Sequence, residues 1–280
     1  MLPVVSHEAK TRRWPYVTIC LIGLNVLAFA FELTASVRFV PFLQEWGLVP
    51  ARVNADVTLH NLATIVTSMF LHVGWVHLVG NMWFLYVFGD AVEDAFGPYW
   101  YLLLYLIAGF FGDVFYLAVS SSSPLPVVGA SGAISGVLAA SLVLWPHARL
   151  KTPALLLLLY VISLTYPVMI AVGIPGWALG GALVFVLSMF ASIILMRTRV
   201  GGSRQPFIVQ LLGMVELPSW LVLSFFFTLQ LWSGALVLVN PAYGGAVGFW
   251  AHVGGFVVGG VLAFVFPKQP VQLARRPVLG

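Results

Sequence analysis

Apolar stretches that are long enough to cross a lipid bilayer follow one another along most of the chain. A spanning helix needs about 20 mostly apolar residues. Eight stretches of roughly that length lie at 15–34, 73–90, 98–118, 130–146, 153–172, 177–196, 218–236 and 247–266. Only 8% of the 280 residues are charged, whereas a soluble domain has about 25%. The sequence therefore predicts an all-α polytopic membrane protein with about eight spans.

The placement of lysine and arginine predicts how these spans are oriented. With the N-terminus inside, eleven of the 13 basic residues fall in inner segments, and only Arg38 and Arg52 fall in outer ones. Because positive charge marks the cytoplasmic side, both termini are predicted to be cytoplasmic. The first apolar run is too long for the roughly 7–15-residue apolar region of a signal peptide, so we expect a retained helix. These features favour a bacterial inner membrane.

Five polar residues lie in or beside the apolar stretches. They are His72, His77, Asn81, Ser131 and His252. Because polar groups are costly to bury in hydrocarbon, they mark candidate functional sites. Ser131 is predicted to open its helix, where first-turn N–H groups have no intrahelical partner. A serine hydroxyl needs a base to become a nucleophile, and His252 is the natural candidate for that base.

The other three polar residues belong to one predicted helix and its outer end. His77 and Asn81 are four residues apart and therefore share a helix face. Both side chains can donate N–H groups to one point, which is how enzymes stabilise a developing oxyanion. His72 lies five residues before His77, closer to the outer interface. The predicted span directions place the candidate residues at a similar depth below the outer surface.

Glycine pairs predict how two of these helices approach each other. GxxxG motifs at 132–136 and 255–259 directly follow Ser131 and His252. Such motifs allow close contact between helix backbones in lipid. Packing of the two motifs would bring the serine and the histidine within hydrogen-bonding distance.

Each residue also has an explanation that does not involve catalysis. A buried serine often bonds back to its own helix, and a lone intramembrane histidine can be a proton relay, a metal ligand or a packed polar group. Asp113, late in the third predicted span, could orient His252 or have a structural or interfacial role, and we favour the second. Cys20 is the only cysteine, which excludes an internal disulfide and a thiolate metal cluster.

Three motifs together carry a resemblance to a known family. They are His72-x4-His77-x3-Asn81 followed by the stretch 88–97, then Gly129-Ala130-Ser131-Gly132, then Ala251-His252-x2-Gly255-x3-Gly259. They resemble the rhomboid family of intramembrane serine proteases. The resemblance implies a Ser131–His252 dyad without an aspartate. It also implies cleavage of the transmembrane segments of other proteins near the outer leaflet.

The resemblance further assigns roles to the remaining motif residues. It implies an oxyanion site made by His77, Asn81 and the backbone N–H of Ser131. Supporting positions near the active site are occupied by His72, Gly129 and Gly132.

The chain departs from the usual family pattern in three places. The first loop lacks the clear Trp-Arg pair of many members and has residues 61–68 in its place. How this loop is anchored is therefore left open. Ser135 stands where some members have an aromatic residue that stacks on the catalytic histidine. Six core spans are usual, so the segment 153–196 is an addition to that core.

The predicted organisation is a rhomboid-like six-helix core with an additional two-helix hairpin. A cytoplasmic tail (1–13) precedes four core spans (14–152), which include an amphipathic interfacial loop (35–71). The hairpin (153–204), the last two core spans (205–267) and a second cytoplasmic tail (268–280) follow. An insertion of two spans would leave the direction of the last two core spans unchanged.

Three functions compete on this sequence. The leading one is a serine endopeptidase that cleaves transmembrane protein substrates in the lipid bilayer, without metal, cofactor or nucleic acid. The second is an inactive relative that binds transmembrane helices, and the intact Ser131 and His252 argue against it. The third is a transporter with a histidine proton relay. No obvious repeat and no paired midplane carboxylates support that third function.

Overall fold

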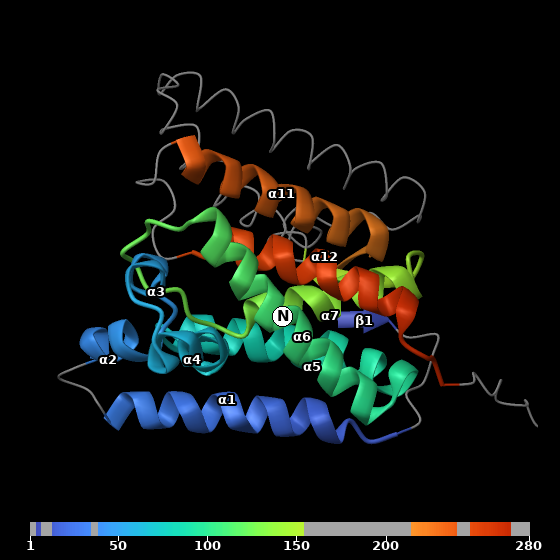
Figure 1. Ribbon diagram of the computed structural model, residues 1–280. Helices are drawn as coiled ribbons and strands as arrows, with labels where there is room; N and C mark the ends of the chain where they lie inside the picture. Colours follow the sequence, from blue (N-terminus) through green and yellow to red (C-terminus); the bar gives the residue numbers. More distant parts are fainter. Residues whose placement is uncertain (1–3, 7–12, 35–38, 154–213, 240–246, 270–280) are drawn as a thin grey trace, which may run out of the picture.

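The computed structural model describes residues 4–6, 13–34, 39–153, 214–239 and 247–269, and most of them lie in a bundle of helices (Figure 1). The longer helices are α1 (Tyr16–Thr34), α5 (Trp75–Phe96), α6 (Pro98–Val119), α7 (Ser131–Leu144), α11 (Ser219–Val239) and α12 (Phe249–Val265). Each overlaps an apolar stretch of the sequence, so the predicted helical polytopic fold is confirmed. The predicted hairpin spans lie outside the described residues, except for Pro153.

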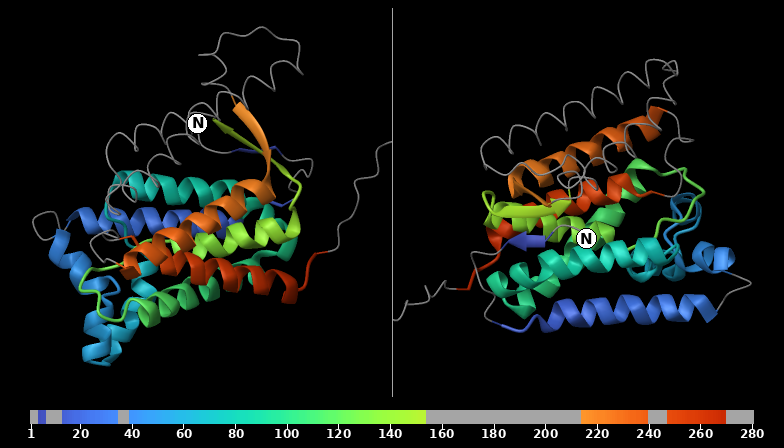
Figure 2. Two further views of the ribbon diagram at one scale, coloured as in Figure 1. Left: turned by 90° about the horizontal axis from the view of Figure 1, so that it is seen from above. Right: turned by 180° about the vertical axis from the view of Figure 1, so that it is seen from behind.

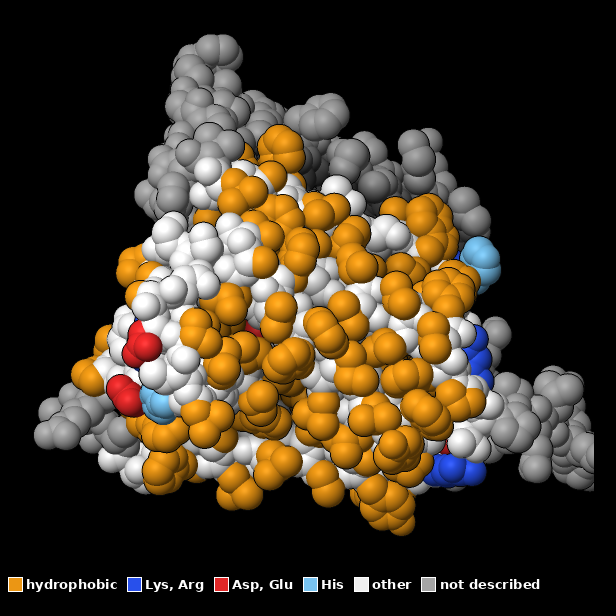
Figure 3. All heavy atoms as spheres, viewed as in Figure 1, with side chains coloured by type: hydrophobic (Ala, Val, Ile, Leu, Met, Phe, Trp, Pro, Cys, Tyr) orange, Lys and Arg blue, Asp and Glu red, His pale blue; other side chains and the backbone are white. Residues whose placement is uncertain are grey.

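Hydrophobic side chains cover the middle of the face shown in Figure 3. Lys and Arg gather at one end of this face, and the two most prominent acidic side chains lie at the other. Large apolar residues such as Leu27, Phe31 and Val76 are exposed. An apolar surface of this extent is expected where a protein contacts lipid.

Differences in helix length determine how deep the helix ends lie. The helices α1, α6 and α11 are long and apolar enough to cross a membrane. In contrast, α7 has only 14 residues, and at about 1.5 Å per residue it is shorter than a hydrocarbon core of about 30 Å. Because α7 ends shortly before Arg149 in the sequence, we expect its first residue, Ser131, to lie below the opposite surface.

The centre of the bundle is formed by α6, α7 and α12, with α1 packed on α5 and α11 packed on α12 (Figures 1 and 2). The backbones of α7 and α12 touch. A Cβ on Gly255 would meet the carbonyl oxygen of Gly132, and a Cβ on Gly259 would meet the Cα of Gly136. The close approach predicted from the GxxxG motifs is therefore confirmed.

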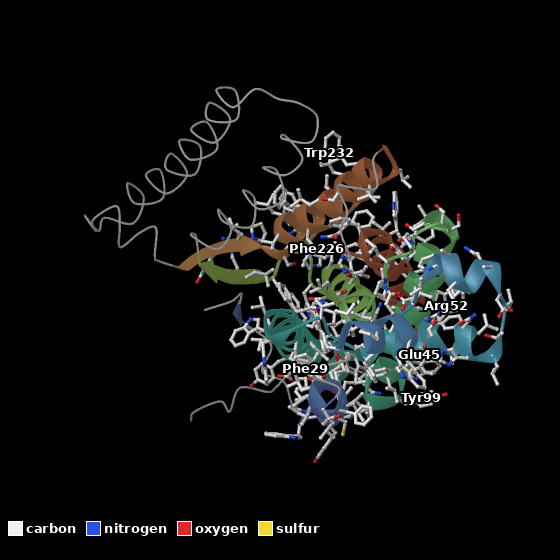
Figure 4. All side chains as sticks on the ribbon, turned by 90° about the vertical axis from the view of Figure 1, so that its left-hand side faces the viewer. Phe29, Glu45, Arg52, Tyr99, Phe226 and Trp232 are labelled. Carbon is white, nitrogen blue, oxygen red and sulfur yellow. The ribbon has the colours of Figure 1, made fainter. Side chains whose placement is uncertain are left out.

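The segment between α1 and α5 folds into a series of short helices. These are α2 (Phe39–Trp46), α3 (Pro50–Ala55), α4 (Leu59–Thr67) and the 3-10 turn η2 (Ser68–Phe70). The Arg52 guanidinium donates to the backbone carbonyls of Gln44, Glu45 and Gly47, and Figure 4 shows Arg52 and Glu45 on these short helices. Arg52 thus anchors this loop, and this answers how the loop is held in the absence of a clear Trp-Arg pair.

A three-stranded antiparallel sheet lies beside the bundle, and the sequence analysis did not predict it. Its order is β1 (Val4–Ser6), β2 (Arg149–Pro153) and β3 (Met214–Pro218), and Figure 2 shows β2 and β3 side by side. Strands of three to five residues carry too little alternation to be recognised in a sequence. Pro153 pairs with Met214, so β2 and β3 join residues that are far apart in the sequence.

Candidate active site

Ser131 and His252 come together from two helices at the centre of the bundle. Ser131 is the first residue of α7, and His252 lies in the first turn of α12. The hydroxyl oxygen of Ser131 lies 2.7 Å from Nε2 of His252, although the two residues are 121 positions apart in the sequence. This distance is that of a hydrogen bond between a hydroxyl and an imidazole nitrogen.

The turn before Ser131 depends on a glycine for two reasons. Gly129 has a φ of +129°, a region that residues with a Cβ rarely adopt. A Cβ there would also lie 2.8 Å from Nε2 of His77 and 3.4 Å from Nδ2 of Asn81. The predicted donors therefore lie directly against the backbone that leads into α7.

A network of hydrogen bonds holds the amide of Asn81. Asn81 Nδ2 lies 3.0 Å from Nε2 of His72, and His72 Nδ1 lies 3.3 Å from the carbonyl oxygen of Phe70. A carbonyl only accepts, so Nδ1 carries the proton and Nε2 accepts from Asn81. The backbone N–H of His72 in turn donates to the buried carboxylate of Glu32, at 3.1 Å from Oε2. One N–H of the Asn81 amide remains for another acceptor.

The second histidine of this helix lies beside the first. The ring centroids of His72 and His77 are 5.0 Å apart. His77 Nδ1 is buried and has no hydrogen-bond partner among the described residues. Because a buried polar atom without a partner is unfavourable, this nitrogen is a candidate for a contact with a bound molecule or with water.

Gln230, like Glu32, is a residue of the site that was not predicted from the sequence. Its Oε1 lies 2.8 Å from Nδ1 of His252, on the ring edge opposite to Ser131. Phe226, one turn earlier on α11, has its ring centroid 6.5 Å from that of His252, with an interplanar angle of 35°. The sequence did contain a signal, because Gln230 is the only carboxamide within α11 and α11 has no charged residue.

Asp113 has the structural role that the sequence analysis favoured. Its Oδ2 accepts a hydrogen bond of 2.8 Å from the hydroxyl of Ser68. The carbonyl oxygen of Ser68 accepts from the N–H of Gly129, also at 2.8 Å. Asp113 therefore supports the turn before Ser131, and the neighbour of His252 Nδ1 is Gln230.

Two further residues have local roles. Ser135 does not replace the aromatic residue of some rhomboids, because its hydroxyl donates to the carbonyl oxygen of Ser131 at 2.8 Å. Glu93, at the opposite end of the bundle, accepts from the backbone N–H of Val17 and Thr18. Among the described residues, no group of three or more His, Cys, Asp or Glu side chains is arranged to hold a metal ion.

About half of the chain is similar to a known protein family. The family model described as "Rhomboid domain" matches residues 59–194. This match, together with the relatives described next, supports a rhomboid family protein. The matched rhomboid stretch contains His77, Asn81 and Ser131, whereas His252 lies beyond it and is brought to Ser131 by the fold.

Several rhomboid relatives align with the chain over part of their length. RHOMBOID-like protein 12, mitochondrial, from Arabidopsis thaliana is 35% identical over 124 residues, which cover 36% of this chain and 37% of the relative. Rhomboid protease GluP from Bacillus subtilis is 35% identical over 129 residues, which cover 46% of this chain and 24% of the relative. Rhomboid protein 1, mitochondrial, from Saccharomyces cerevisiae is 32% identical over 135 residues, which cover 46% of this chain and 37% of the relative.

These matches support an integral, multi-pass membrane protein related to proteases. The matched region spans between about a quarter and a little over a third of the relatives' own length. Two of the three names specify mitochondria, so the comparisons do not support a bacterial inner membrane over other membranes.

Proposed function

We propose that this protein is an intramembrane serine endopeptidase in which Ser131 is the nucleophile and His252 is the base. The 2.7 Å contact between Ser131 Oγ and His252 Nε2 is the observation that carries the proposal. Two polar side chains from distant parts of the sequence meet here among apolar helices. Burying them in this place is costly unless it serves a function, and the pairing is the one that activates a serine hydroxyl.

The proposed reaction follows from this geometry. His252 Nε2 takes the hydroxyl proton while Ser131 Oγ attacks the carbonyl carbon of a peptide bond. The protonated imidazole then gives its proton to the leaving amine nitrogen, which leaves an ester on Ser131. A water molecule, deprotonated by His252, attacks this ester, and the serine is released with its proton restored.

Three N–H donors are proposed to stabilise the negative oxygen of the tetrahedral intermediates. They are the backbone N–H of Ser131 and the side chains of Asn81 and His77. The position of Ser131 at the start of α7 supports this role, because first-turn N–H groups lack an intrahelical acceptor. The contact of both side chains with the Gly129 turn supports the same role, and such donors contribute about 10²- to 10³-fold to kcat.

The substrates are proposed to be transmembrane segments of other membrane proteins, cut on the side of the bilayer where α7 begins. The apolar surface and the depth of Ser131 support this proposal. Cytoplasmic termini and an inserted hairpin at 153–204 belong to the same proposal, and the pairing of Pro153 with Met214 is compatible with them. A bacterial inner membrane stays a prediction from the positions of Lys and Arg.

Labelling with a fluorophosphonate tests the proposal directly. Purified wild-type protein in detergent, Ser131→Ala and His252→Ala would be treated side by side, with a known serine hydrolase as the reagent control. We expect an adduct on Ser131 of the wild type and none on either variant. A folded wild type that is not labelled would instead favour a protein that binds transmembrane helices without cleaving them.

A further inference from the structure

The two ring nitrogens of His252 have different partners on different helices. Nε2 faces the Ser131 hydroxyl on α7, and Nδ1 faces the Oε1 atom of Gln230 on α11. A neutral imidazole carries one proton, and a base for Ser131 needs its lone pair on Nε2. The proton must then be on Nδ1, where an acceptor is required, and the carboxamide oxygen of Gln230 is that acceptor.

We propose that Gln230 is a positioning residue that holds His252 in the tautomer with Nδ1 protonated and Nε2 facing Ser131. This inference rests on the proposed protease function. The carboxamide takes the place that an aspartate has in a Ser-His-Asp triad, where the acidic group selects the tautomer and the ring orientation. Because a carboxamide is neutral, Gln230 orients the ring without adding a charge to the apolar interior.

The surroundings of Gln230 support this role over a purely structural one. Gln230 is 4% exposed in a helix that otherwise contains apolar residues, small residues and hydroxyl residues. Its partner belongs to another helix. By comparison, the hydroxyl of Thr228 on the same helix bonds to the carbonyl oxygen of Ser224, within α11. Figure 4 shows the two faces of α11, with Phe226 toward the bundle and Trp232 away from it.

Phe226 contributes to the same arrangement from the same helix. Its ring lies beside the imidazole, one helical turn from Gln230. The face and the Nδ1 edge of His252 are thus both limited by α11, while Ser135 of α7 is turned to its own helix. It follows that the orientation of the His252 ring depends on how α11 packs against α12.

Two substitutions of nearly equal size separate positioning from packing. Gln230→Met keeps the length of the side chain and removes the acceptor, whereas Gln230→Glu keeps an acceptor oxygen. If Gln230 only filled space in an apolar helix, methionine would be tolerated better than glutamate. If Gln230 holds the tautomer, Gln230→Glu is instead more active than Gln230→Met. We expect the rate of fluorophosphonate labelling to fall about 10- to 100-fold in Gln230→Met, the effect of losing one hydrogen bond to a reacting group.

The experiment compares these variants in labelling rate, in substrate cleavage and in thermal unfolding, with Thr228→Val as the matched control on α11. Thr228→Val is expected to retain labelling close to that of the wild type, and Gln230→Glu is expected to be labelled faster than Gln230→Met. Equal labelling by Gln230→Met and the wild type would overturn the inference, as would better labelling by Gln230→Met than by Gln230→Glu. If the wild type itself is not labelled, the proposed function fails first, so the two failures are distinguishable.

A spectroscopic readout is independent of activity and of the stability of the variants. ¹⁵N shifts of histidine-labelled wild type at alkaline pH report which ring nitrogen is protonated, and comparison with His252→Ala assigns the signals. We expect His252 to carry its proton on Nδ1. A proton on Nε2 in the wild type would overturn the inference, whatever the behaviour of the variants.

Discussion

Asn81 donates to Nε2 of His72 across 3.0 Å, so His72 determines the direction of the remaining N–H of that amide. The tautomer of His72 is in turn selected by the carbonyl oxygen of Phe70. His72, to which the resemblance assigned a supporting position, thus acts on the candidate oxyanion site through Asn81.

Substitution of His72 is expected to weaken catalysis through Asn81. In His72→Phe the amide loses its acceptor and its orientation, and we expect kcat to fall by about tenfold, equivalent to about 1.4 kcal/mol. The measurement is the rate of cleavage or labelling in the wild-type and Asn81→Ala backgrounds. If His72 acts through Asn81, His72→Phe should lower the rate little further in the Asn81→Ala background. If the effects of the two substitutions were fully additive, this role would be contradicted. His60→Phe on α4 is a histidine control outside the site, where Nε2 of the half-buried side chain contacts Glu45 at 3.1 Å.

The Gly129 turn is expected to tolerate no side chain. Gly129→Ala would introduce strain of about 1–3 kcal/mol at a positive φ, and its Cβ would displace His77. We expect a loss of labelling well beyond the loss of thermal stability. Gly74→Ala is the matched control, because a Cβ there has no neighbour within 4 Å and its φ of 162° is close to extended. An active Gly129→Ala would contradict the placement of His77 against this turn.

Two glycines on α12 test the contact between the catalytic helices. Gly255→Ala would push α12 away from the carbonyl oxygen of Gly132, whereas a Cβ on Gly260 would lie 3.8 Å from Ala139, an ordinary contact. Overpacking of this kind typically lowers the free energy of unfolding by about 1–3 kcal/mol. We expect Gly255→Ala to lower both the thermal midpoint and labelling, and Gly260→Ala to change neither much. Equal behaviour of the two variants would be inconsistent with this packing.

Asp113 is expected to matter for stability and not for the base. Asp113→Asn keeps an oxygen that accepts from Ser68, so labelling should stay close to that of the wild type. Asp113→Leu removes this acceptor and should lower the free energy of unfolding by about 0.5–1.5 kcal/mol, because the Ser68 hydroxyl can still donate to the carbonyl oxygen of Ile65. If Asp113→Asn lost labelling as completely as His252→Ala, the acid would have to be part of the proton-transfer chemistry after all.

The helices and the chemistry of the site followed from local features of the sequence. Apolar runs of sufficient length predicted α1, α6 and α11 almost to their ends, because hydrocarbon leaves a backbone few alternatives to a helix. The spacing of His77 and Asn81 predicted a shared face, since helical periodicity is a local property. The GxxxG motifs predicted the approach of α7 and α12 for the same reason.

Other features depended on contacts between distant segments. Gln230 carried no motif, and its role became visible only when α11 packed against α12 and its oxygen met His252. The pairing of β1 with β2 joins Val4–Ser6 to residues that lie more than 140 positions later in the sequence, and no local pattern predicts this pairing. Arg52 likewise anchors the first loop through carbonyls whose positions depend on how that loop folds.

The sequence by itself determined that this chain forms apolar helices in a membrane and which side chains have the chemistry of a serine hydrolase. Only the tertiary structure decided that Ser131 Oγ lies 2.7 Å from His252 Nε2 and that Gln230 occupies the other edge of the imidazole. The physical reason is that helix formation depends on neighbours three or four residues apart. The orientation of a buried side chain depends instead on partners from other helices, which become neighbours only when the bundle is packed.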